Sequence, residues 1–329
     1  MKLNVSCENG SYDVVLGNGI LSNLTDLYDF SKHNKILIVS DDGVPSKYIK
    51  EVKSQLTNSF EFVFKHGETN KNIETFIKLQ ETLLDYEFTK SDLLIAIGGG
   101  VVGDLVGFTA STYKRGIKYI NIPTTTLSQI DSSIGGKTAI DMGEVKNAIG
   151  TIYQPNLVVI DFDTLKTLDK YQYSSGLVEA LKAGLLADEM IVDLFEDVDK
   201  NLEEIIYRAL KVKQKIVEED VFEKGIRKHL NLGHTIGHSI EILSNMSHGE
   251  AVGLGMLYMI KDEKLKIKIK NILSSLNLKT EFEFNKEKAL NILVNDKKAK
   301  ENGIQMVFVN NICDIEVKTL NKEEIKGLL

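Results

Sequence analysis

The chain has 329 residues, of which 43% are hydrophobic and 26% charged, values typical of a globular protein with one large or, as we expect, two medium domains. The net charge is −7, and Lys and Arg are scattered among Asp and Glu, so nucleic acid is excluded as an expected partner. No apolar run approaches the roughly 20 residues of a membrane span, and the N-terminus does not resemble a signal peptide, so we expect a cytoplasmic protein with no membrane partner.

The first half of the chain reads as an α/β domain. Its first 25 residues alternate apolar and polar with Asn-Gly breaks, which predicts an antiparallel hairpin or edge pair. Short apolar runs follow, separated by stretches of helical period, and this alternation is typical of buried parallel strands joined by crossover helices. The runs lie at 35–41, 60–65, 92–100, 119–124 and 157–163. We therefore expect residues 1–165 to form an open α/β domain with a mainly parallel sheet.

The second half is expected to be helical. From about residue 170 the strand signals nearly vanish, and apolar residues recur at helical spacing in 176–195, 199–217 and 228–261. Residues 166–329 are therefore predicted to form an all-α domain. The segment 305–320, QMVFVNNICDIEVKTL, stays open between a short strand pair and a return to the first domain.

A run of glycines marks a possible nucleotide site. Gly98, Gly99 and Gly100 follow an apolar strand directly, and a helix is expected to begin near Gly103 and Asp104. Glycines at this place let backbone N–H groups approach a pyrophosphate at a helix N-terminus. The pattern is not G-x-G-x-x-G, and an ordinary tight turn explains it equally well.

A polar cluster follows the strand at 119–124. It contains hydroxyl groups, two glycines, Asp131 and Lys137, and then Lys146 and Asn147. In α/β proteins ligands bind at the carboxyl ends of strands, so we interpret the cluster as the wall of a binding site. The alternative is a polar loop with solvated lysines.

Four of the chain's six histidines cluster in the second half: His229, His234, His238 and His248. His234 and His238 would share one helix face, a spacing that suits metal binding or a ligand-plus-acid pair. No Glu follows His234, so the pattern is not that of the HExxH metalloproteases. Spacing does not choose among the carboxylates that could complete a site, Glu179, Glu241 and Glu250.

Basic residues of the helical half are the last signal: Lys182, Lys213, Arg227, Lys297 and Lys298. Each alone is typical of a solvated helix face. A metal site, a glycine-rich turn and several cations together indicate an anionic substrate whose hydroxyl is oxidised by a nicotinamide cofactor.

The motifs, taken in order, resemble those of the 3-dehydroquinate synthase family of sugar-phosphate cyclases. They are GGGVVGDLVGF, YKRG, IPTTTLSQIDSSIGGKTAID, KNAIGTIYQP, GLVEALK, NLGHTIGH, HGEAVGLGM and DKK, between residues 98 and 298. The resemblance implies a Rossmann-like NAD-binding domain followed by an α-helical metal-binding domain. It also implies a lyase of the shikimate pathway, which converts 3-deoxy-D-arabino-heptulosonate 7-phosphate into 3-dehydroquinate and phosphate by transient NAD-linked oxidation, phosphate elimination, reduction and aldol closure.

The resemblance further implies three sets of site residues. The ligands of Zn²⁺ or Co²⁺ are Glu179, His234 and His248. The NAD⁺ residues are Asp41, Glu68, Lys71, Gly99, Gly100, Asp104, Thr124, Thr125, Lys146, Thr167 and Leu168. The substrate and catalytic residues are Asp131, Lys137, Asn147, Lys182, Lys213, Arg227, Asn231, His238 and Lys297, with Arg115 reaching the phosphate from the neighbouring subunit of a homodimer. His238 then lies beside the metal as a substrate-binding or proton-transfer group.

The chain departs from the family pattern in three places. Residues 141–145, DMGEV, stand where family members usually carry a Pro and a Gly just ahead of the Lys-Asn pair. Asp169 replaces a usual Pro, and the stretch between HGEAVGLGM and DKK is shortened, as though a helical segment were trimmed. The rival interpretations are another sugar-phosphate cyclase, a metal-dependent polyol dehydrogenase, and an inactive binding protein of the same fold.

Overall fold

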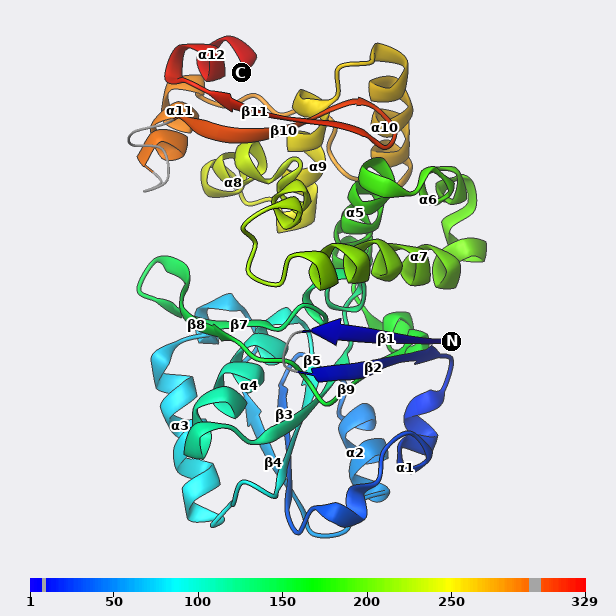
Figure 1. The fold of residues 1–329 in the computed structure, drawn as a ribbon, viewed down its shortest axis with the longest axis vertical. Coiled ribbons are helices and arrows are strands. Elements are labelled where there is room, and N and C mark those ends of the chain that lie inside the picture. The colour runs from blue at the N-terminus through cyan, green and yellow to red at the C-terminus, as the bar shows by residue number, and fades with distance from the viewer. Residues whose placement is uncertain (8–9, 296–302) are drawn as a thin grey trace. The chain divides into compact units, whose positions relative to one another are not determined.

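The computed structural model describes residues 1–7, 10–295 and 303–329 and divides the chain into two compact units, Met1–Leu168 and Asp169–Leu329 (Figure 1). The division falls after Leu168, whereas the sequence prediction placed it after residue 165, inside the 3-10 helix Phe162–Thr167. Among the described residues, no helix combines the length and apolar character that crossing a membrane would require.

A seven-stranded sheet forms the centre of the first unit, in the order β1-β2-β9-β6-β5-β3-β4. Its strands are β1 Lys2–Cys7, β2 Gly10–Gly17, β3 Ile36–Asp41, β4 Ser59–Phe64, β5 Leu93–Gly98, β6 Lys118–Pro123 and β9 Leu157–Asp161. The β1–β2 pair is antiparallel, and the other pairs of neighbouring strands are parallel. The predicted N-terminal hairpin and mainly parallel sheet are therefore confirmed.

Helices cover both faces of this sheet, which is why its central strands are continuous apolar runs. On β3, Leu37 and Val39 belong to the core under α3 and α4, while Ile36 and Ile38 belong to the core under α1 and α2 (Figure 1). The helices are α1 Leu24–Leu27, α2 Ser46–Ser54, α3 Ile73–Asp85 and α4 Gly100–Thr112. Short helical turns lie at η1 Ile20–Asn23, η2 Phe30–Lys32, η3 Glu68–Asn70, η4 Tyr113–Arg115, η5 Ser128–Ser132 and η6 Phe162–Thr167.

This unit also contains a two-stranded sheet that the sequence pattern did not predict. Strands β7 (Lys137–Met142) and β8 (Val145–Ile152) pair antiparallel, within the segment interpreted as a polar site wall. Strand β7 contacts α4, whereas β8 is exposed along its length. Because β8 buries no apolar face, it lacks the alternation by which a half-buried strand is recognised.

The second unit is helical, with one strand pair among the residues that the structure describes. Its helices are α5 Lys170–Ala187, α6 Glu189–Leu194, α7 Val198–Glu219, α8 His234–Leu243, α9 His248–Met259, α10 Glu263–Ser275, α11 Lys286–Asn295 and α12 Lys322–Leu328, with short turns at η7 Phe195–Asp197 and η8 Ile226–Asn231. Strands β10 (Ile304–Asn311) and β11 (Asp314–Leu320) pair antiparallel and contact α5 and α9 through β10. The open question about 305–320 is thus decided for a strand pair, which the expectation of an all-α unit had missed.

Candidate active site

The structure brings Glu179, His234 and His248 together in the second unit. One possible ligand atom from each residue lies within 4.8 Å of those from the other two. Oε1 of Glu179 is 3.7 Å from Nε2 of His234 and 4.0 Å from Nε2 of His248. Two imidazole nitrogens and one carboxylate oxygen form the three-ligand set of a catalytic Zn²⁺ or Co²⁺ site. The donor set and its spacing therefore fit a divalent metal.

Close packing of three helices creates this cluster. Glu179 lies within α5, and His234 and His248 are the first residues of α8 and α9. A Cβ atom on Gly249 would lie 1.9 Å from the carbonyl oxygen of Ser175 in α5, and one on Gly255 would lie 2.0 Å from that of Gly233. Only glycine allows α9 to approach both neighbours this closely. Gly249 and Gly255 of the HGEAVGLGM segment are therefore required by the packing of α9.

Burial and charge set the protonation of the two histidines. Burial lowers the pKa of His234 to about 4, and the charge of Lys182 acts in the same direction, so the ring is neutral at neutral pH. Burial also opposes the charged form of His248, but its hydrogen bond to Glu241 and the charge of Glu179 outweigh this effect and raise its pKa. Glu179 itself is buried and forms an ion pair with Lys182, one turn later in α5.

The three carboxylates that spacing left open have different surroundings. Glu179 belongs to the cluster, whereas Oε2 of Glu241 lies 3.1 Å from Nδ1 of His248, behind the ring. Glu250 is buried and accepts hydrogen bonds from the hydroxyl of Tyr171 (2.6 Å) and the backbone N–H of Lys279 (2.8 Å). Glu250 therefore ties α9 to its neighbours and stands apart from the metal cluster.

The remaining predicted residues of the helical unit lie on α5, α7, η8 and α8. Lys182, Lys213 and Arg227 are buried, a rare state for cations. The guanidinium of Arg227 donates to the carbonyl of Val221 at 2.6 Å. The other positions are Asn231, whose amide donates to Glu223 at 3.0 Å, and His238, which is exposed on α8 outside the three-residue metal group. Lys297 lies outside the described residues.

In the first unit, predicted NAD⁺ residues gather at the carboxyl ends of β5 and β6. Gly99 precedes α4, which begins at Gly100, so a long helix follows the strand but starts three residues before the predicted position near Gly103. The N–H of Thr124 donates to the carbonyl of Gly98 at 2.9 Å, which joins the two strand ends. A Cβ atom on Gly99 would lie 3.1 Å from Cγ2 of Thr125, so the bare backbone keeps this turn open. Such a turn suits a pyrophosphate.

Lys71 is the centre of a charged cluster in the same unit. Its side chain is only 4% exposed, and its Nζ lies 2.6 Å from Glu68, 3.3 Å from Asp104 and 2.8 Å from Oδ1 of Asn147. Burial raises the pKa of Asp104 to about 6 against the opposing charge of Lys71. Burial lowers the pKa of Lys71, but the charges of Asp104 and Glu68 outweigh it and raise the pKa overall.

Other predicted residues of this unit have separate surroundings. Asp41 is buried at the end of β3 and accepts a hydrogen bond from the N–H of Gly43 at 2.9 Å; burial raises its pKa. The hydroxyls of Thr167 and Tyr48 lie 3.0 Å apart, and Leu168 follows. Asp131 lies in η5, Lys137 begins β7, Lys146 is exposed on β8, and Arg115 is exposed in a turn after α4.

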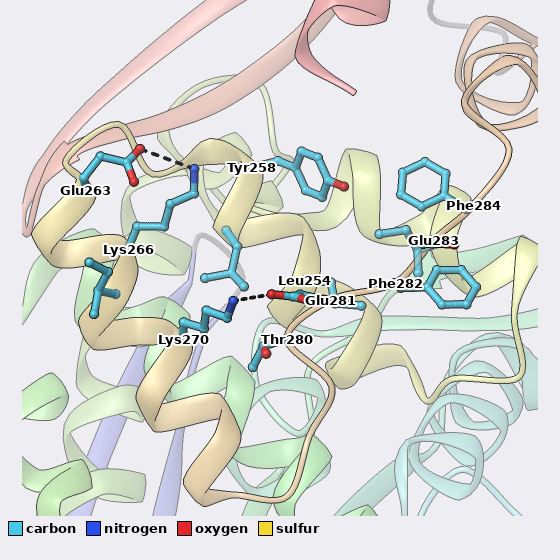
Figure 2. A pocket seen from close by; sticks show the side chains of 13 residues that line it. Leu254, Tyr258, Glu263, Lys266, Lys270, Thr280, Glu281, Phe282, Glu283 and Phe284 are labelled. Carbon is cyan, nitrogen blue, oxygen red and sulfur yellow. Dashed lines mark hydrogen bonds and ion pairs between the residues drawn. The ribbon is translucent and has the colours of Figure 1, made fainter.

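A separate cavity of about 490 Å³ lies in the helical unit (Figure 2). It is lined by α9, α10 and the segment 280–284, with Tyr258, Phe282 and Phe284 on one side and the ion pair of Lys270 with Glu281 on the other. None of the predicted site residues is among the residues that line it, so this cavity is distinct from the metal cluster.

Two family models match the chain: 3-dehydroquinate synthase N-terminal over residues 61–175, and 3-dehydroquinate synthase C-terminal over residues 176–299. The 3-dehydroquinate synthase of Streptococcus mutans serotype c is 39% identical over 353 aligned positions, covering 100% of this chain and 99% of the relative. That of Lactococcus lactis subsp. cremoris (strain SK11) is 39% identical with the same coverage. Because 353 positions exceed the chain's 329 residues, the alignment contains gaps in this chain, as a shortened segment requires.

Solved structures share the fold. A 2-deoxy-scyllo-inosose synthase, complexed with carbaglucose-6-phosphate, NAD⁺ and Co²⁺, superposes with a TM-score of 0.91 at 24% identity, covering 100% of this chain and 99% of that one. ValA, a 2-epi-5-epi-valiolone synthase from Streptomyces hygroscopicus subsp. jinggangensis 5008 with NAD⁺ and Zn²⁺ bound, gives a TM-score of 0.86 at 26% identity, covering 98% and 97%. The family models and full-length relatives together show that the chain belongs to the 3-dehydroquinate synthase family.

Proposed function

We propose that the chain is a phosphate-eliminating lyase that converts 3-deoxy-D-arabino-heptulosonate 7-phosphate into 3-dehydroquinate. The observation that carries this proposal is the cluster of Glu179, His234 and His248, a metal-ligand set in a chain whose family performs this reaction. When bound, Zn²⁺ or Co²⁺ would polarise substrate hydroxyls, and NAD⁺ would accept a hydride and later return it.

The first unit would hold the dinucleotide. The backbone of Gly99 and Gly100 at the start of α4 favours the pyrophosphate, because the helix N-terminus offers N–H groups and a positive dipole. Asp41 and the cluster around Lys71 supply carboxylates suited to ribose hydroxyls. The other assigned residues are Glu68, Asp104, Thr124, Thr125, Lys146, Thr167 and Leu168.

The substrate carries a carboxylate and a phosphate, and cationic side chains would bind both of these anionic groups. Lys137 and Arg115, the latter from the second subunit of a homodimer, would hold the phosphate while one of its own oxygens takes the C6 proton and the C7–O bond breaks. The two cations neutralise the charge of the departing phosphate. The buried cations Lys213 and Arg227 favour the carboxylated end, because a buried cation is stabilised by an anionic ligand. Asp131, Asn147, Lys182, Asn231, His238 and Lys297 complete the set.

The test measures phosphate release from 3-deoxy-D-arabino-heptulosonate 7-phosphate with and without NAD⁺ and a chelator, and identifies the product by mass and NMR. We expect release that needs NAD⁺, is abolished by the chelator and restored by Zn²⁺ or Co²⁺, and yields 3-dehydroquinate without net NADH. Net NADH would indicate a polyol dehydrogenase. The absence of turnover, with metal and NAD⁺ demonstrably bound, would overturn the proposal and direct the search to other sugar phosphates.

A further inference from the structure

The β7–β8 hairpin contains an irregularity at Asp141. Regular pairing is interrupted between Ile140 and Met142 of β7, so that Asp141 faces residues 146–148 of β8. Asn147 lies in this bulge with a φ of 52°, in the left-handed region that favours glycine or asparagine. Bulges change the direction of side chains, and this one carries Lys146 and Asn147.

The carboxylate of Asp141 holds the bulge together. Its Oδ1 accepts a hydrogen bond from the backbone N–H of Asn147 at 2.7 Å, and the N–H of Asp141 donates to the carbonyl of Lys71 at 2.7 Å. Nζ of Lys71 donates to Oδ1 of Asn147 at 2.8 Å and lies 3.8 Å from Oδ1 of Asp141. Asp141 thus connects both strands of the hairpin to the turn that precedes α3.

The surroundings show why such a restraint is needed. The segment DMGEV has no Pro, and its glycine, Gly143, lies at the turn and not just ahead of the Lys-Asn pair, where the family usually carries a Pro and a Gly. Pro would have fixed a backbone φ angle. Strand β8 is exposed along its length, so packing contributes little to holding it. A left-handed residue costs about 1 kcal/mol or more unless its surroundings hold it in place, and the hydrogen bond from Asn147 to Asp141 does so directly.

We propose that Asp141 is a positioning residue, whose carboxylate fixes the bulge at 146–148 and so sets the backbone from which Lys146 and Asn147 act on the nicotinamide and the substrate. The proposal rests on the proposed function, in which these two side chains act. It adds a residue outside the assigned sets and explains how this chain keeps its hairpin geometry without the usual Pro and Gly just ahead of Lys146. Lys71 contacts both the hairpin and the proposed ribose site, so it links hairpin order to dinucleotide binding.

The experiment compares Asp141→Ala and Asp141→Asn, with Glu144→Ala as the control, an exposed acid at the tip of the same hairpin. We measure kcat and KM for phosphate release, metal content, and amide hydrogen exchange in residues 143–149. Loss of a charged hydrogen bond predicts a fall in kcat of roughly ten- to a hundredfold for Asp141→Ala, with faster exchange in the hairpin and unchanged metal content. Asp141→Asn should recover most of both readouts, because its amide oxygen accepts the same bond.

Wild-type kcat and unchanged hairpin exchange in Asp141→Ala would overturn the proposal, as would an equal loss in Asp141→Asn. Asp141→Ser repeats the truncation with a polar side chain, so the test does not depend on the folding of the alanine variant. If the wild-type chain releases no phosphate, the proposed function fails instead. Hydrogen exchange then still decides whether Asp141 orders the hairpin.

Discussion

Nδ1 of His248 lies 3.1 Å from Oε2 of Glu241, while Nε2 of the same ring is the atom that faces Glu179 at 4.0 Å. An imidazole that binds metal through one nitrogen is commonly oriented by a carboxylate at the other, and losing that carboxylate typically weakens metal affinity by about 10- to 100-fold. We expect Glu241→Ala to show such a loss in a competition titration with a chelating dye. Glu287→Ala, an exposed acid on α11, should bind metal normally.

Variants of His238 and His234 should distinguish a residue that lies beside the metal from one that binds it. His238 shares α8 with His234 but lies outside the three-residue metal group. We expect His238→Ala to keep one metal ion per chain and to lose roughly 10²- to 10⁴-fold in kcat, the usual range for a lost proton-transfer group. His234→Ala should lose the metal as well. Metal analysis of the two purified variants makes the comparison, and a metal-free His238→Ala would contradict the assignment.

The sequence predicted most of the first unit because its buried parallel strands are short continuous apolar runs between helical segments. It missed β7–β8, because β8 is exposed along its length and buries no apolar face that would produce an alternating pattern. It also left 305–320 undecided, since a strand pair packed on helices and a strand added to a distant sheet have the same local pattern.

The metal cluster was predictable only with the resemblance. Helical spacing pointed to His234 and His238, whereas the structure groups His234 with His248, the first residue of the next helix. His248 reaches the cluster because the backbones of α5 and α9 approach closely at Gly249. The spacing of residues along a single helix cannot predict such a contact between helices. The contacts of Glu241 and Asp141 likewise depend on residues brought together by the fold.

Gly249 offers a direct test of how packing builds the cluster. A Cβ atom there would overlap the carbonyl of Ser175, so we expect Gly249→Ala to destabilise the fold by roughly 1–3 kcal/mol and to weaken metal binding beside His248. Gly253 lies in the same helix, but a Cβ there would lie 3.0 Å from Cδ2 of Leu273, the end of a side chain and not a backbone atom. Gly253→Ala should therefore cost less. Urea unfolding and metal titration of both variants measure the difference, and equal effects would contradict this account.

Asp104 should make stability depend on pH. Its folded pKa of about 6 lies above the ordinary value of 3.8, so the folded state binds the proton more tightly than the unfolded state does. The stability that this proton provides is present at pH 4 and is lost as the pH rises through about 6. The free energy of unfolding of Asp104→Asn should therefore exceed that of wild type by about 1–2 kcal/mol at pH 7 and differ little from it at pH 4.

Urea unfolding of the NAD⁺-free protein at the two pH values measures this difference. Lys71 keeps Glu68 and Asp141 nearby in the variant, so it does not lose all of its charge partners. A variant that is less stable than wild type at pH 7 would show that the ion pair with Lys71 outweighs the burial of Asp104.

Arg115 lies in a strained turn, and its action across subunits can be tested by mixing variants. Lys114 and Arg115 both have left-handed φ angles, 48° and 65°, and such strain at an exposed non-glycine pair is typical of functional sites. We expect Arg115→Ala and His238→Ala to be nearly inactive alone. In a heterodimer, the site with an intact His238 would receive the intact Arg115 of the other subunit. An equal mixture should therefore recover about a quarter of wild-type activity after subunit exchange.

Lys114→Ala changes the same turn and should remain active. This control distinguishes the loss of phosphate binding by Arg115 from a general disturbance of the strained turn. Native mass spectrometry of the mixture verifies that heterodimers have formed. Recovery without heterodimers would point to a contaminant, whereas heterodimers without recovery would place Arg115 in the site of its own subunit. Because each inactive variant lacks a different group, only a site assembled from two chains can restore turnover.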